Sequence, residues 1–256
     1  MNFFFGINSS IFNSQLTIPR FQNSKPSNSN YHLYKIQILN NKWEINEQTN
    51  VKSSKDFYWV DNNEMENGII FFLAKKNEIQ KIEKYNFKKL INLNSYTDTS
   101  PAYRANLKIS LNNGGFSSYQ SEYPFSMITK MGGILSPLST LLNKEADKNI
   151  IFFKNIYFLP KKEEFNAYFI DIKTKKVLKK TKIFSNFLNE IIIEKNLIKP
   201  EIFLFTDNYI GVPIFCSIKN KHISFEHTHP PHSYIFSDDK FKVINSLKKE
   251  FSEIIS

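Results

Sequence analysis

Four of the five histidines lie in one short segment, residues 222–232, which reads HISFEHTHPPH. If a β-strand extends to residue 229, its side chains alternate between two faces. One face then carries Ile223, Phe225, His227 and His229, and the other carries His222, Ser224, Glu226 and Thr228. The first face is apolar until its last two positions. The pattern therefore places two imidazoles at the rim of a hydrophobic core.

Imidazole nitrogens suit zinc, iron, copper or nickel, and two histidines at i and i+2 can bind one ion. Pro230-Pro231 directs the chain outward, and His232 can return as a third ligand. We predict a divalent transition metal, zinc or iron, at His227, His229 and His232, with Glu226 or Glu122 as a further ligand. The function expected from this set is metal binding, and a non-haem metalloenzyme if the protein is catalytic. The alternative is an exposed histidine-rich strand end, or histidines that form hydrogen bonds within the fold.

The H-x-H spacing of His227 and His229 resembles the first metal-binding motif of the cupins, a family of β-barrels. The flanking glycines of that motif and the glutamate that follows its second histidine are missing. No second histidine motif follows downstream. We therefore assign no family.

A second candidate site is the segment 116–125, FSSYQSEYPF. Rings that stack and amides that form hydrogen bonds are typical of sites for sugars and small polar ligands. Tyr119, Gln120, Glu122 and Tyr123 are the ligand-binding residues predicted here. In this interpretation the protein is a non-catalytic module that binds a carbohydrate or a small polar ligand on a β-sandwich. The alternative is an ordered loop whose polar groups satisfy buried backbone.

Several chemistries have no signal in the residues. The seven glycines form neither G-x-G-x-x-G, a P-loop nor G-x-S-x-G, so no nucleotide cofactor is expected. Cys216 is the one cysteine, which excludes an internal disulfide and a C-x-x-C pair, and its apolar neighbours predict a buried thiol. Whether the protein is an enzyme stays open.

The net charge of +10 favours an anionic partner, but only Arg20 and Arg104 are arginines. Because bidentate contacts to phosphate and guanine are mostly made by arginine, nucleic acid is not the expected partner. No uncharged apolar run is long enough to span a membrane, and the N-terminus lacks a signal-peptide pattern. We expect a cytoplasmic protein.

Apolar patterning predicts the elements that carry these sites. Residues 1–30 are expected to form a loosely ordered lead, and residues 31–95 a small α/β part with strands at 31–39, 57–60 and 69–73 and a surface helix at 76–91. Asn112 to Gly115 predict a turn, and Ser136-Pro137 predict the start of a helix through residue 146. No internal repeat appears in the sequence.

After a polar, turn-rich stretch at residues 92–102, strand-like runs follow from residue 103 to residue 229, and the later ones recur every 8–12 residues. One of them is a predicted hairpin around the lysine-rich turn 173–176. Residues 238–254 then change to the 3.6-residue period of an amphipathic helix. The predicted fold class is mainly β (α+β). Residues 96–256 are expected to form an antiparallel sandwich or barrel closed by the C-terminal helix, after a less regular N-terminal part.

Overall fold

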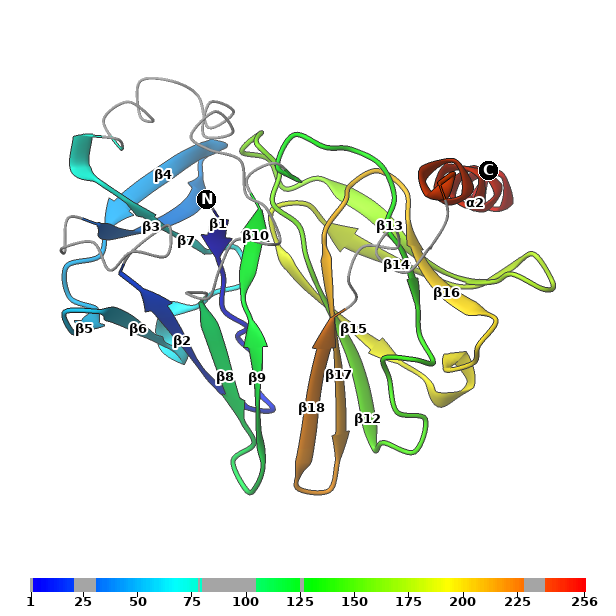
Figure 1. The fold of residues 1–256 in the computed structure, drawn as a ribbon, viewed down its shortest axis with the longest axis horizontal. Helices are drawn as coiled ribbons and strands as arrows, with labels where there is room; N and C mark the ends of the chain where they lie inside the picture. The colour runs from blue at the N-terminus through cyan, green and yellow to red at the C-terminus, as the bar shows by residue number, and fades with distance from the viewer. Residues whose placement is uncertain (1, 21–30, 78, 80–104, 125–126, 228–237) are drawn as a thin grey trace. The chain divides into compact units, whose positions relative to one another are not determined.

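The computed structural model describes residues 2–20, 31–77, 79, 105–124, 127–227 and 238–256. Over these residues the chain is mainly β, with antiparallel sheets and a C-terminal helix (Figure 1). The chain forms two compact units. Unit 1 comprises Met1–Lys130, Ile156–Lys162 and Asn186–Leu188, and unit 2 comprises Met131–Asn155, Glu163–Ser185 and Asn189–Ser256.

The described residues of unit 1 form two five-stranded antiparallel sheets, ordered β10-β1-β7-β3-β4 and β5-β6-β2-β8-β9. The second sheet buries one face through cross-strand neighbours, as Leu16 pairs with both Val60 and Leu107 in the core. The elements are β1 (Asn2–Phe4), β2 (Asn13–Pro19), β3 (His32–Leu39), β4 (Lys42–Glu47), β5 (Lys52–Ser53), β6 (Phe57–Asp61), η1 (Asn62–Glu64), β7 (Ile70–Ala74), β8 (Asn106–Ser110), β9 (Phe116–Gln120) and β10 (Glu122–Pro124).

In unit 2, the part that the structure describes forms two four-stranded antiparallel sheets, ordered β11-β16-β13-β14 and β15-β12-β17-β18. Its central strand β12 is apolar on both faces, and six of its seven residues are buried. The elements are β11 (Leu135–Pro137), β12 (Lys148–Lys154), β13 (Glu164–Asp171), β14 (Lys176–Phe184), β15 (Leu188–Ile193), η4 (Lys195–Leu197), β16 (Ile202–Thr206), β17 (Val212–Lys219), β18 (His222–His227) and α2 (Lys240–Ile255).

The two units repeat one strand topology, although no repeat is visible in the sequence. In strand order, β1-β7-β3-β4 corresponds to β11-β16-β13-β14, and β6-β2-β8-β9 corresponds to β15-β12-β17-β18. Along the chain, successive strands are assigned to the two sheets in the same order in both units. Each sheet also contains one β-hairpin. Unit 1 adds β10 and β5 as edge strands. The described strands of the two units therefore share one sheet topology.

The expected sandwich or barrel is not the observed arrangement. The described strands form four separate sheets, and β8, β9 and β10 lie in the sheets of unit 1 because they pair with β2 and β1. The first break between the units follows Lys130, and Ile156–Lys162 and Asn186–Leu188 return to unit 1, whereas the sequence pattern predicts a boundary at residue 96. Long-range pairing of β8 with a strand near the N-terminus accounts for this difference.

Two local expectations are corrected. Residues 2–19 are not a loose lead, because β1 and β2 lie inside the two sheets of unit 1 and the alternating Leu16 and Ile18 are buried. Ser136-Pro137 do not start a helix. They belong to β11, where Ser136 is buried and pairs with Leu204. Proline is tolerated there because β11 is the edge strand of its sheet.

Several predicted elements are confirmed. The turn after residue 111 joins β8 to β9, and the lysine-rich turn joins β13 to β14, with Lys175 at a φ of 55°. Of the expected helix at 76–91, residues 76, 77 and 79 are helical and the remainder lies outside the described residues. No helix in the described part is long and apolar enough to cross a membrane.

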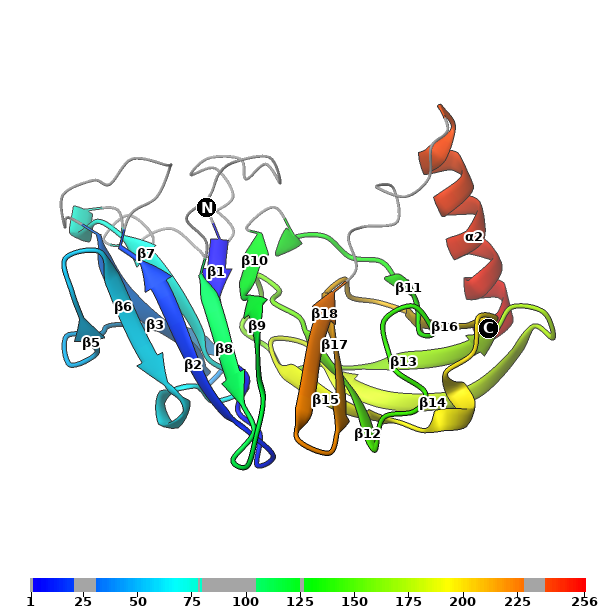
Figure 2. The ribbon, with the colours of Figure 1, turned by 60° about the horizontal axis from the view of Figure 1, so that its bottom comes forward.

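The C-terminal helix α2 is the other confirmed element. Phe251 near its end is buried against the β11-β16-β13-β14 sheet, and its ring stacks on Phe205 at 5.7 Å between centroids. Figure 2 shows that the C-terminal end of α2 lies beside this sheet, whereas its N-terminal end points away from it. Phe241, in that outer half, is 60% exposed.

Candidate functional site

The predicted alternation of β18 is present in its described residues. Phe225 is buried, and His227 is half-buried on the same face of the strand as Phe225. His222, Ser224 and Glu226, on the other face, are exposed. Glu226 therefore lies on the opposite face of the strand from His227. His229 and His232 lie outside the described residues. Within the described residues, no group of three His, Cys, Asp or Glu side chains could hold a metal ion.

The segment expected to bind a polar ligand forms strands β9 and β10 and not a loop. Tyr119 and Tyr123 are buried in unit 1, so little or none of either ring is open to solvent. Burial raises the pKa of both phenols above the ordinary value of 10. Gln120 and Glu122 are partly exposed, and the Gln120 amide donates a hydrogen bond to Glu122 Oε2 at 3.3 Å. A ligand contact in this segment therefore depends on Gln120 and Glu122.

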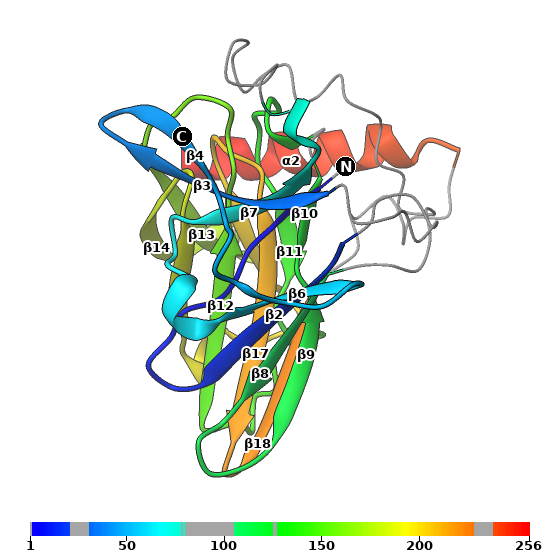
Figure 3. The ribbon, with the colours of Figure 1, turned by 90° about the vertical axis from the view of Figure 1, so that its left-hand side faces the viewer.

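Gln120 belongs to an open sheet face, which we call the polar face. It is the side of the β5-β6-β2-β8-β9 sheet opposite the buried Leu16 and Leu107. Figure 3 shows β6, β2, β8 and β9 side by side. One row of directly paired residues crosses all five strands, and it consists of Lys52, Trp59, Thr17, Asn106 and Gln120. Four strand spacings make this row about 19 Å long.

Aromatic rings lie at two places on the polar face. On β6, the rings of Phe57 and Trp59 lie 6.1 Å apart, and Lys52 Nζ lies 5.7 Å from the Trp59 ring. On β9, Phe116 is 70% exposed, and Lys108 Nζ lies 5.3 Å from its ring. Flat rings open to solvent can stack against the apolar faces of a ligand.

Polar side chains occupy the area between the rings. Gln15 on β2 donates its amide to Asp61 Oδ1 at 2.7 Å, and Asn13 donates to Asn112 Oδ1 at 2.8 Å. Asn106 is exposed on β8. Amide oxygens and nitrogens fixed in this way can both accept and donate hydrogen bonds to hydroxyl groups.

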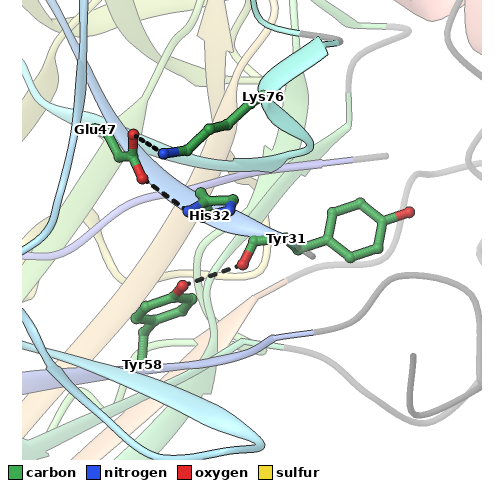
Figure 4. A network of polar contacts seen from close by, with 5 residues as sticks. All are labelled: Tyr31, His32, Glu47, Tyr58 and Lys76. Carbon is green, nitrogen blue, oxygen red and sulfur yellow. Dashed lines mark hydrogen bonds and ion pairs between the residues drawn. The ribbon is translucent and has the colours of Figure 1, made fainter. Parts of the chain in front are cut away.

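A separate polar network ties together the ends of β3, β4 and β7 in unit 1 (Figure 4). His32 Nδ1 lies 2.7 Å from Glu47 Oε1, and Lys76 Nζ lies 3.4 Å from Glu47 Oε2. His32 and Glu47 share one face of the sheet, because Tyr34 lies two residues from His32 and pairs with Glu47, and Lys76 follows the end of β7. Nearby, the Tyr58 hydroxyl donates to the Tyr31 carbonyl at 3.1 Å. The Glu47 carboxylate therefore orients the His32 imidazole and links the ends of β3 and β4 to the residues that follow β7.

Sequence reasoning missed the polar face because it arises from pairings between distant segments. The signal that could have indicated this face is the alternation in Phe57–Asp61. Tyr58 and Val60 are buried there, whereas Trp59 is half-buried. His32 was missed because it is the one histidine outside the 222–232 segment.

The buried state expected for Cys216 is confirmed. Its side chain is fully buried in β17, and burial raises the pKa of the thiol to about 12. The thiol is therefore neutral at physiological pH and packs as a small apolar group.

Comparison of the chain with models of protein families, with curated proteins and with solved structures gives no match. Over the described residues, the fold is therefore that of a mainly β protein with four antiparallel sheets in two units, one of which presents a polar face with exposed rings.

Proposed function

We propose that this protein binds carbohydrate, and that the polar face of unit 1 holds an extended, neutral polysaccharide. The observation that carries the proposal is the open five-stranded face with exposed rings on β6 and β9 and amides between them. Rings supply stacking and amides supply hydrogen bonds, which is the combination that a sugar polymer requires.

The shape of the polar face supports an extended ligand. Its rings belong to β6 and β9, which are separated by β2 and β8 in the sheet. A chain that contacts both must therefore cross three strand spacings, about 14 Å. A single sugar is too short for both contacts, whereas an oligosaccharide can reach from one ring to the other.

The charge of the polar face supports a neutral ligand. Lys52 and Lys108 lie over rings of the face, and Asp61 lies in the next row. The two lysines exceed the one aspartate by a single charge, and with no arginine on the described part of the face this gives little attraction for a nucleic acid backbone.

Isothermal titration of the full chain with cellohexaose, xylohexaose and chitohexaose tests the proposal. At least one hexasaccharide is expected to bind, and Trp59→Ala is expected to weaken its affinity about tenfold or more because a stacking ring is lost. Phe241→Ala, which removes an exposed ring from α2 in unit 2, is the matched control and leaves the affinity unchanged. No binding of any of the three, or an equal loss in both variants, contradicts the proposal.

Metal binding is the second candidate, favoured by the half-buried position of His227 beside the buried Phe225 at the end of β18. In this proposal His227 binds a zinc or iron ion together with His229 and His232. Elemental analysis of protein purified without a histidine tag tests it. One metal ion per chain, lost in His227→Ala, is the expected result, and metal-free protein contradicts it.

A further inference from the structure

Unit 2 has a hollow of about 360 Å³ against the exposed face of β18. The β17–β18 hairpin forms one wall, and the segment 140–146 forms the other. This volume lies at the small end of the range for ligand pockets. The hollow therefore has room for a compact ligand and not for a large cofactor.

The wall formed by the segment 140–146 is held by a partly buried hydrogen-bond network. Ser217 Oγ donates to Asn149 Oδ1 at 2.6 Å and accepts the backbone N–H of Asn143 at 2.9 Å. The Asn149 amide donates to the Asn143 carbonyl at 2.9 Å. These bonds tie the segment 140–146 to β12 and β17. A wall fixed before binding reduces the entropy cost of holding a ligand.

The charges along the hollow are separated by sign. Lys219 and His222 are directly paired at the hairpin end, and Glu226 lies four residues along β18 on the same face. Four residues of a strand span about 13 Å. Ser224 lies between them, so one end of the hollow is basic, the middle carries a hydroxyl, and the other end is acidic. Asp147 does not line the hollow, and its carboxylate accepts the Asn220 N–H at 2.8 Å in the hairpin turn.

We propose that this hollow binds a short peptide with free termini, whose carboxylate lies at Lys219 and His222 and whose ammonium lies at Glu226. An extended tripeptide spans roughly 10 Å, which leaves room for the two protein side chains at its ends. Leu141, on the opposite wall, lines the hollow as an apolar contact for the peptide side chains. The site lies in unit 2, so it does not depend on the carbohydrate proposal for unit 1.

Titration of the ¹⁵N-labelled full chain with trialanine tests the peptide site. Saturable shifts are expected for the amides of residues 219–226. Acetylation of the peptide amine or amidation of its carboxylate is expected to weaken binding about tenfold or more, because each removes one charge-assisted contact. Absence of shifts at millimolar trialanine, or equal binding of the blocked peptides, overturns the proposal.

Two pairs of variants locate the contacts. Glu226→Gln and Lys219→Gln are each expected to weaken trialanine binding about tenfold or more. Glu190→Gln and Lys221→Gln change exposed residues of the same unit that do not line the hollow, and they are expected to bind as the unchanged chain does. Equal effects of the lining and control variants overturn the assignment. All four positions are exposed, so the fold is retained, and circular dichroism verifies this.

Discussion

Lys154 shows how a single residue can set the pH dependence of stability. Its side chain is buried at the end of β12, and burial lowers the pKa of the amine from 10.5 to about 7. Between these values the unfolded chain keeps a proton that the folded chain has released. Stability attributable to this residue therefore rises with pH from about 7 to about 10.5.

Lys154→Met is expected to raise the free energy of unfolding at pH 7 and below, because it removes a buried charge and keeps an apolar stem. The substitution also removes the rise in the free energy of unfolding with pH that Lys154 causes above pH 7, which is up to about 1.4 kcal/mol per pH unit. Urea unfolding of both proteins at pH 6, 8 and 10 measures this difference. A difference between the two proteins that stays constant with pH would contradict the prediction.

At the scale of elements, α2 is attached to unit 2 through its C-terminal half. Phe251 contacts Phe203 and Phe205 of β16, and Ile254 and Ile255 pack on the same cluster. Phe251→Ala is expected to cost about 3 kcal/mol, because a buried ring leaves a cavity. Phe241→Ala changes an exposed ring of the same helix and is expected to change stability little. Equal urea midpoints for Phe251→Ala and the unchanged chain would show that α2 is not docked.

The β3–β4 turn offers a second test at this scale. Asn40 and Asn41 have φ angles of 51° and 57°, the left-handed pair of a two-residue hairpin turn. Asn41→Gly is expected to keep or slightly raise stability because glycine adopts this conformation without strain. Asn41→Val is expected to lower stability by about 1–2 kcal/mol. Thermal unfolding measures both, and the same midpoint for valine and glycine would contradict this account of the turn.

Local patterning predicted many elements, because period and turn residues act over a few positions. It predicted α2, the strand that became β3, and the alternation that separates Phe225 from Glu226. It failed where pairing between distant segments decides the outcome. Ser136-Pro137 have the local pattern of a helix start, yet they pair with β16 and form an edge strand of its sheet. Tyr119 was expected at a ligand, yet its pairing with Leu107 turns the ring into the core.

At the scale of the whole molecule, the strand topology of unit 1 recurs in unit 2 without visible sequence repetition. Corresponding strands need only similar apolar alternation to occupy corresponding places, so their residue identities can diverge. The exposed faces are therefore able to differ. Unit 1 presents the exposed Phe57 and Phe116 and the half-buried Trp59 on an open sheet, whereas unit 2 presents a hollow with Lys219 and Glu226 at its two ends.

The carbohydrate proposal is tested most directly by the fluorescence of Trp59. The chain contains two tryptophans, Trp43 and Trp59, so Trp59 is the one indole of the Trp43→Phe variant. Titration of this variant with the hexasaccharide that binds best is expected to change the emission of Trp59 saturably, with the affinity found by calorimetry. Emission that stays constant while calorimetry reports saturation would show that the sugar does not bind at the polar face.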